Sequence, residues 1–133
     1  AYAPLMAWEK QLEDLKRRAA LAEKMGGAEK LARQHGRGKL DARERLRRVL
    51  DKNSFREIGK IAGMAQYDGR NDLESLMASN FVFGRGKVNG RQVVIGGDDF
   101  TVRGGSADAT IKEKHIKCEQ MEEVQTGGGE ARN

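Results

Sequence analysis

The first part of the chain repeats its apolar residues at the spacing of a helix. The intervals are four, three, four and three residues, along Trp8, Leu12, Leu15, Ala19 and Ala22. Residues at these intervals share one face of a helix, so we expect a long amphipathic helix here. Gly26 and Gly27 follow, and glycine tolerates the left-handed conformation that ends many helices.

Two shorter helices are predicted next. The first covers residues 28–34 and is broken by Gly36 and Gly38. Asp41 then has the character of an N-cap, because its carboxylate can accept a hydrogen bond from a free N–H of the first turn. Glu44 stands three residues later, as in a capping box. The helix that follows carries Leu46, Val49 and Leu50 on one side.

The apolar period changes to that of strands in the second half. Residues 81–88 and 91–95 flank Asn89-Gly90, the pair that best accepts the two positive φ angles of a type I′ turn, so a hairpin is predicted. A further extended piece is expected at 100–102. A helix is expected from Asp108 to about Glu122, with one face formed by Ile111, His115, Cys118 and Met121. Residues 66–79 are polar without a clear pattern, and 126–133 have no core signal.

Composition narrows the class of protein. The chain has 133 residues, which suits one domain, and 38% of them are hydrophobic. No window approaches the roughly 18 apolar residues of a membrane-spanning helix. The one cysteine excludes an internal disulfide framework and fits a reducing compartment, and two histidines with one cysteine argue against a structural zinc site. The chain begins at Ala1 rather than Met, so we expect a trimmed protein or a fragment.

Positive charge is concentrated in residues 30–48. Eight cations and two carboxylates leave this stretch at +6, against +5 for the whole chain; the cations are Lys30, Arg33, Arg37, Lys39, Arg43, Arg45, Arg47 and Arg48. Such a cluster is typical of a site for nucleic acid, acidic lipid or a phosphorylated ligand, and equally of a solvated helix face. The stretch contains no aromatic residue to stack on bases, which weakens the hypothesis that it binds nucleic acid.

A second candidate site is Gly104-Gly105-Ser106, between an extended segment and a helix. Backbone N–H groups at a helix N-terminus can bind anions or developing oxyanions. Most such turns are only turns, and neither the P-loop nor the dinucleotide glycine spacing is met. Asp98-Asp99 could be a carboxylate pair, although turn chemistry is the commoner role.

Three further residues have polar chemistry of their own. His35 could bind phosphate or cap a helix end, and capping is commoner. His115 and Cys118 fall on an apolar helix face and are interpreted as packed core residues.

The motifs taken in order resemble a known family. They are Met25 to Lys30, Arg33-Gln34-His35, Gly38 to Leu40, Ala42 to Leu46, Ser54 to Gly59, Gly84 to Arg91, Asp99 to Ser106 and Lys114 to Met121. This series resembles the N-terminal segment of the carboxyltransferase (beta-type) subunit of biotin-dependent acyl-CoA carboxylases, the family of propionyl-CoA and methylcrotonyl-CoA carboxylases and related decarboxylases. The resemblance covers roughly residues 8 to 121.

The resemblance implies an α/β fold of the crotonase-like kind, a spiral of ββα units. Residues 1–53 would form a basic helical arm, and 54–133 the start of an incomplete carboxyltransferase N-domain. The family transfers CO2 from N-carboxybiotin to the α-carbon of an acyl-CoA through an enolate, which backbone N–H groups stabilise. The acyl-CoA candidates are then Arg37, Lys39, Arg43 and Arg45 on the phosphate side, with Gly104, Gly105 and Ser106 near the acyl group; no catalytic residue and no metal ligand are assigned.

The resemblance also implies partners: a biotin carboxylase or a biotinylated carrier, and further carboxyltransferase subunits in an oligomer. It implies a cytoplasmic location, or the mitochondrial matrix in a eukaryote. The chain departs from the family after Met121, where Glu122 to Gln125 lead into Thr126 and three glycines without a buried strand. Two alternatives stay open: a small basic module that binds nucleic acid, and a relative that has lost catalysis and serves in assembly.

Overall fold

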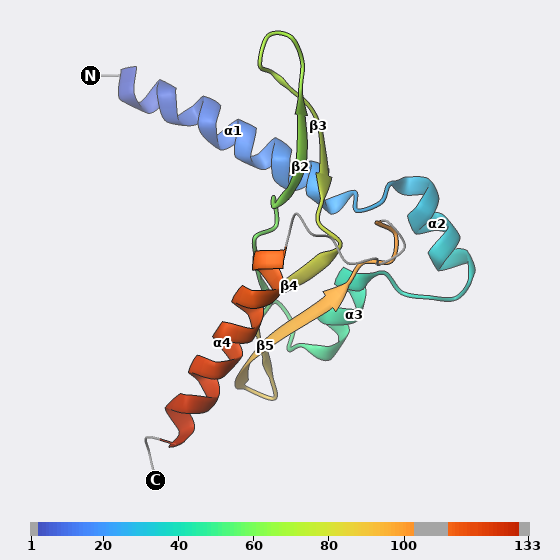
Figure 1. Cartoon of the computed structure of the whole chain (residues 1–133), viewed down its shortest axis with the longest axis vertical. Coiled ribbons are helices and arrows are strands. Elements are labelled where there is room, and N and C mark those ends of the chain that lie inside the picture. The colour runs from blue at the N-terminus through green and yellow to red at the C-terminus, as the bar shows by residue number, and fades with distance from the viewer. Residues whose placement is uncertain (1–2, 103–111, 131–133) are drawn as a thin grey trace.

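A computed structural model describes residues 3–102 and 112–130, and side chains for 8–102 and 113–123. Four helices are present in this part of the chain: α1 (Ala3–Glu23), α2 (Ala28–Gly36), α3 (Ala42–Val49) and α4 (Lys112–Glu130). The five strands are β1 (Arg56–Ile58), β2 (Gly63–Tyr67), β3 (Leu73–Ala78), β4 (Phe81–Val88) and β5 (Arg91–Asp98). Figure 1 shows α1 and α4 projecting from the body of the molecule in different directions.

The three predicted N-terminal helices are confirmed. The capping box of α3 is complete, because the Asp41 carboxylate accepts a hydrogen bond from the Glu44 N–H at 2.9 Å and the Glu44 carboxylate accepts one from the Asp41 N–H at 3.0 Å. Leu46 and Leu50 are buried as expected, whereas Val49 is exposed and does not belong to the apolar face. The α3 stripe is therefore narrower than its sequence suggests.

The predicted hairpin supplies β4 and β5 of a three-stranded antiparallel sheet of order β1-β4-β5, in which β4 is the central strand. Asn89 and Gly90 both have positive φ, 51° and 80°, as a type I′ turn requires. The Asp51 carboxylate accepts hydrogen bonds from both turn N–H groups at 2.9 Å. Gly84 allows β1 to approach, because a Cβ at this position would lie 2.1 Å from the Arg56 carbonyl oxygen.

Helices cover both faces of this sheet. Alternate residues of a strand point to opposite faces, and two separate buried clusters result. On one face Phe81 and Phe83 pack with Cys118 and Met121 of α4. On the other, Val82 packs with Met25, Ala42 and Leu46. The predicted α/β organisation is thus a helix–sheet–helix sandwich.

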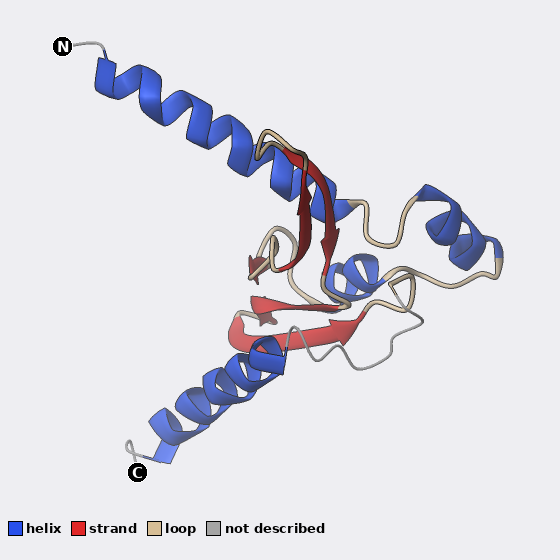
Figure 2. Cartoon of the chain, turned by 45° about the horizontal axis from the view of Figure 1, so that its top comes forward, coloured by secondary structure: helices blue, strands red, loops and turns tan. Residues whose placement is uncertain are grey.

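A second hairpin, β2–β3, was not expected from residues 66–79. Its two strands pair antiparallel, and their only covering layer within the described part of the chain is α1 (Figure 2). Arg17 donates to the Leu73 carbonyl oxygen at 2.8 Å, and Arg18 to the Tyr67 hydroxyl at 3.1 Å. The exposed positions of these strands include Met64 and Met77 as well as polar residues, so the sequence has no clear alternation of apolar and polar positions.

Two further expectations are corrected. Residues 100–102 form a turn rather than an extended piece, because the Asp99 carboxylate accepts a hydrogen bond from the Thr101 N–H at 2.9 Å. Helix α4 continues to Glu130, through the three glycines at 127–129 that suggested a tail. Helix α3 packs on β4 and β5, and α1 packs on β3. The boundary at residue 53 between arm and domain stays a prediction.

Candidate functional site

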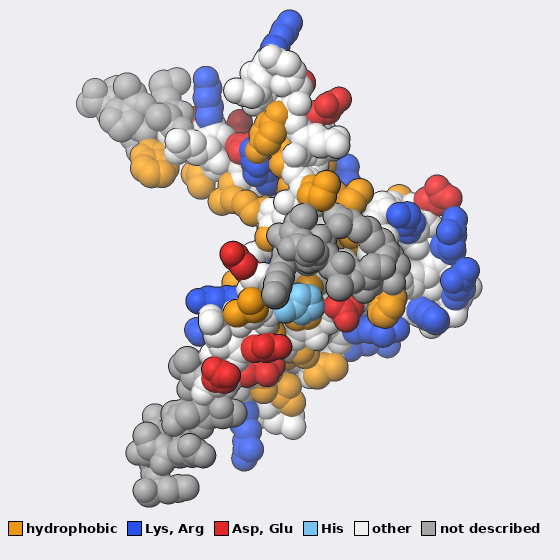
Figure 3. All heavy atoms as spheres, in the orientation of Figure 1, with side chains coloured by type: hydrophobic (Ala, Val, Ile, Leu, Met, Phe, Trp, Pro, Cys, Tyr) orange, Lys and Arg blue, Asp and Glu red, His pale blue; other side chains and the backbone are white. Residues whose placement is uncertain are grey.

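The strongest candidate site is a hollow of about 520 Å³ between α2, the start of α3 and the turn after β5. We call it the basic pocket. It is lined by Lys30, Arg33, Gln34, Arg37, Lys39, Arg45, Phe100 and Thr101. Five of these are cations, and none of the described lining residues is acidic. Lysine and arginine side chains gather at the end of the molecule that α2 forms (Figure 3).

The position of each wall follows from local structure. The turn carrying Phe100 and Thr101 is fixed by Asp99, which is buried and accepts from both the N–H and the hydroxyl of Thr101. The Thr101 hydroxyl oxygen accepts a hydrogen bond from the Gly26 N–H at 3.0 Å. A Cβ at residue 26 would lie 1.9 Å from the Thr101 carbonyl oxygen. Only glycine therefore lets the end of α1 meet this turn.

Arg43, although it lies within the basic run, does not line the pocket. Only 5% of the surface of Arg43 is exposed to solvent. Its guanidinium makes a bidentate pair with Glu57 of β1, at 2.7 and 3.2 Å, and donates to the Ala22 carbonyl oxygen at 3.4 Å. This cation consequently joins the end of α1, α3 and β1 within the core.

Lys114 of α4 is a second buried cation. Its amine donates to the Ser79 hydroxyl at 2.9 Å and lies 6.0 Å from the centre of the Phe83 ring. Burial lowers the pKa of Lys114 to about 8, the Glu57 carboxylate opposes this, and the Arg43 guanidinium adds to it. Arg43, Glu57 and Lys114 together form what we call the buried ion cluster.

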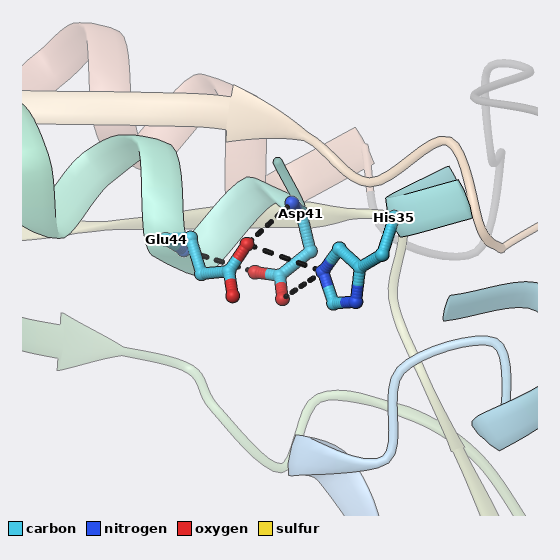
Figure 4. A group of neighbouring side chains, drawn as sticks. All are labelled: His35, Asp41 and Glu44. Carbon is cyan, nitrogen blue, oxygen red and sulfur yellow. Dashed lines mark hydrogen bonds and ion pairs between the residues drawn. The ribbon is translucent and has the colours of Figure 1, made fainter. Parts of the chain in front are cut away.

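His35 bridges α2 to the beginning of α3 (Figure 4). Its Nε2 lies 3.2 Å from a Glu44 carboxylate oxygen and 3.4 Å from one of Asp41. The three potential ligand atoms lie within 4.8 Å of one another, the spacing at which a metal ion could be held. The capping box already uses an oxygen of each carboxylate, so helix capping accounts for the arrangement.

The structure thus brings together three of the sequence candidates, Arg37, Lys39 and Arg45, and separates Arg43 from them. Gly104, Gly105 and Ser106 lie outside the described residues. Sequence reasoning missed Phe100 as a pocket residue, because it was assigned to an extended segment. A signal was available: Phe100 follows two carboxylates that favour a turn.

Both interpretations of the remaining polar residues in α4 are confirmed. His115 is a packed residue, with its ring stacked on Phe81 at a centroid distance of 3.8 Å. Cys118 is buried, and burial raises the pKa of its thiol, with further contributions from Glu122 and Glu119.

None of the helices in the described part of the chain combines the length and the apolar character that a membrane-spanning helix needs.

Known proteins share both the sequence and the fold. The carboxyl transferase domain family matches residues 33–130. The propionyl-CoA carboxylase beta chain of Roseobacter denitrificans is 39% identical over 110 residues, which are 83% of this chain and 22% of that protein. The mitochondrial propionyl-CoA carboxylase beta chain of mouse is 38% identical over 121 residues, 90% of this chain and 22% of that protein.

A solved structure of this family has the same fold as this chain. Transcarboxylase 12S, crystallised as a hexamer with methylmalonyl-coenzyme A and methylmalonic acid bound, superposes with a TM-score of 0.71 and 35% identity. The match covers 85% of this chain and 22% of that chain, so this chain spans less than a quarter of such relatives. These neighbours have the crotonase-like fold, which confirms the predicted fold class. The chain belongs to the carboxyl transferase domain family.

Proposed function

We propose that this chain is the N-terminal portion of a carboxyltransferase, and that the basic pocket binds the phosphate groups of its acyl-CoA substrate. The observation that carries the proposal is the pocket itself: five cations around one hollow, with an exposed phenylalanine at its edge. The names of the relatives support it, since they are propionyl-CoA carboxylase and methylmalonyl-CoA carboxyltransferase subunits.

The chemistry of the walls fits the nucleotide end of coenzyme A. That end carries a diphosphate and a ribose 3′-phosphate, and arginine presents a planar fork that pairs with two phosphate oxygens at once. Adenine needs a flat apolar partner, and Phe100 is 62% exposed beside the cations. We assign Arg37, Lys39 and Arg45 to the phosphates, with Lys30 and Arg33 at the rim.

Arg43 has a different role in this proposal. Its guanidinium already donates two hydrogen bonds to Glu57, so this group is not available to pair with a phosphate. Arg43 instead positions α3, which carries Arg45. Gly104, Gly105 and Ser106 remain proposed acyl-side contacts, whose N–H groups would hold the oxygen of the enolate. Carboxybiotin, carried on a partner, supplies the carboxyl group when bound; we assign none of the described residues to it.

The proposal extends to partners and location. The transcarboxylase match is a hexamer in a multienzyme core, which supports an oligomer of the intact protein that works with a biotin-carrying partner. Relatives from bacteria and from mouse mitochondria support the predicted cytoplasmic or matrix location.

Calorimetric titration with coenzyme A tests the pocket directly on this 133-residue chain. We expect saturable binding that weakens about tenfold in Arg45→Gln, because a charge-assisted bond to phosphate is lost. Dephospho-coenzyme A should bind more weakly than coenzyme A. Arg91→Gln is the matched control: it removes the same charge from an exposed strand end away from the pocket, and it should bind as the unaltered chain does.

Other outcomes would favour the other functions. Binding of single-stranded oligonucleotides in preference to coenzyme A, with a steep salt dependence, would replace the proposal by nucleic-acid binding. An absence of binding to either ligand would contradict the pocket assignment and favour a role in assembly.

A further inference from the structure

Helix α1 carries an apolar stripe that the described part of the chain covers only at one end. Ala22 is fully buried, whereas Trp8, Leu12 and Leu15 are 65%, 52% and 51% exposed. Figure 3 shows hydrophobic side chains along one edge of the arm that α1 forms. The alternating intervals of three and four residues are those of a coiled-coil seam.

The β2–β3 hairpin does not compete for this stripe. It contacts α1 through Arg17 and Arg18. Residues in a helix advance by about 100° each, so Arg17 projects from the side opposite the stripe. The hairpin therefore covers the side opposite the stripe and reaches one flank of it at Arg18, and it leaves Trp8, Leu12 and Leu15 exposed.

We infer that the exposed stripe of α1 binds the same stripe of a second copy, in antiparallel orientation. The evidence is the charge pattern on its flank. Glu9 follows Trp8 and Lys16 follows Leu15, so both stand on the same edge of the stripe and both are exposed. A two-fold axis near Leu12 brings Glu9 of one copy against Lys16 of the other, twice in one interface.

A parallel pair would lack this match. It would set Arg18 against Glu23, and both side chains already have partners within the chain. Arg18 is paired with Asp14 at 2.8 Å and with Tyr67, and Glu23 is paired with Lys60. The antiparallel arrangement uses only charges for which the structure gives no ion pair.

The interface is small, since each copy offers three large apolar side chains. We expect a weak dimer, with a dissociation constant on the order of micromolar. This contact is separate from the basic pocket, which α2, α3 and the turn after β5 build.

Sedimentation equilibrium of the 133-residue chain tests the inference through charge exchange. Lys16→Glu places like charges together and should raise the dimer dissociation constant about tenfold. Glu9→Lys should do the same. A mixture of the two variants should associate as the unaltered chain does, because the mixed dimer has one native Glu9–Lys16 contact and one in which the two charges are exchanged.

Lys10→Glu is the matched control, because Lys10 lies on the opposite side of the helix and the change in charge is the same. It should leave association unchanged, and circular dichroism should show equal helix content in all variants. A chain that stays monomeric at every concentration overturns the inference. So does an equal effect of Lys10→Glu and Lys16→Glu, or a mixture that fails to recover.

Discussion

The buried ion cluster and the basic pocket use the same kind of residue for opposite purposes. Arg43 and Arg45 are two positions apart on α3, yet one is in the core with Glu57 and the other lines an open hollow whose described lining contains no acidic residue. In the cluster the cation is neutralised and holds three elements together. Of the five pocket cations, only Arg33 has an ion pair in the described part of the chain, with Glu29 at 3.3 Å. The other positive charges are left for a ligand, which is what a site for an anion requires.

Helix geometry explains the difference. Arg43 precedes Leu46 by three residues and Leu50 by seven, so it lies on the apolar face of α3. Arg45 lies about 200° around the helix from Arg43 and faces away from the core. A run of positive charge in a sequence is therefore not one functional unit. The position of each residue around the helix decides whether its side chain faces the core or the pocket.

The largest expected effect concerns Arg43. Arg43→Met leaves the Glu57 carboxylate buried without its partner, so we expect the free energy of unfolding to fall by about 3–5 kcal/mol. Urea denaturation followed by circular dichroism measures it. Because the penalty arises from an unpaired charge, Arg43→Met with Glu57→Met should recover most of the loss. A single variant as stable as the unaltered chain would show that the pair does not hold the core together.

The contact that shapes the pocket should come next. Gly26→Ala drives a Cβ against the Thr101 carbonyl oxygen, and we expect a loss of about 1–3 kcal/mol together with weaker coenzyme A binding. Gly36→Ala is the control, since a Cβ there meets nothing within 4 Å and alanine favours the helix. It should be neutral or slightly stabilising. Equal stability of both variants would contradict the close approach of Gly26 to this turn.

Lys114 makes the buried cluster sensitive to pH. Its pKa is about 8 in the folded chain, against the ordinary lysine value of 10.5. Between these values the unfolded chain binds a proton that the folded chain does not, so stability should rise with pH across this window. The gain should be on the order of 1–3 kcal/mol and should be missing in Lys114→Met. Denaturation at about pH 8 and about pH 10 measures it, and equal pH slopes for the two proteins would refute the assignment.

How far the sequence predicts the molecule depends on whether a signal is local. The Asp41–Glu44 cap and the Asn89-Gly90 turn are confirmed because short-range chemistry determines them. The β2–β3 hairpin was missed because it depends on packing against α1, far away in the chain. Likewise, the partner of Arg43 comes from β1, so the sequence could identify the cation but not its pairing.

The smallest change in stability is expected in the pocket. Arg45→Gln removes one of five like charges around a single hollow, so repulsion falls while no buried contact is lost. Stability should change by no more than about 0.5 kcal/mol, with any gain seen at low salt and screened at high salt. Urea denaturation at two salt concentrations measures both the change in stability and its dependence on salt. A loss above about 1 kcal/mol would mean that Arg45, like Arg43, stabilises the fold. If Arg45→Gln leaves the stability almost unchanged but weakens coenzyme A binding, then Arg45 serves ligand binding, whereas Arg43 stabilises the core.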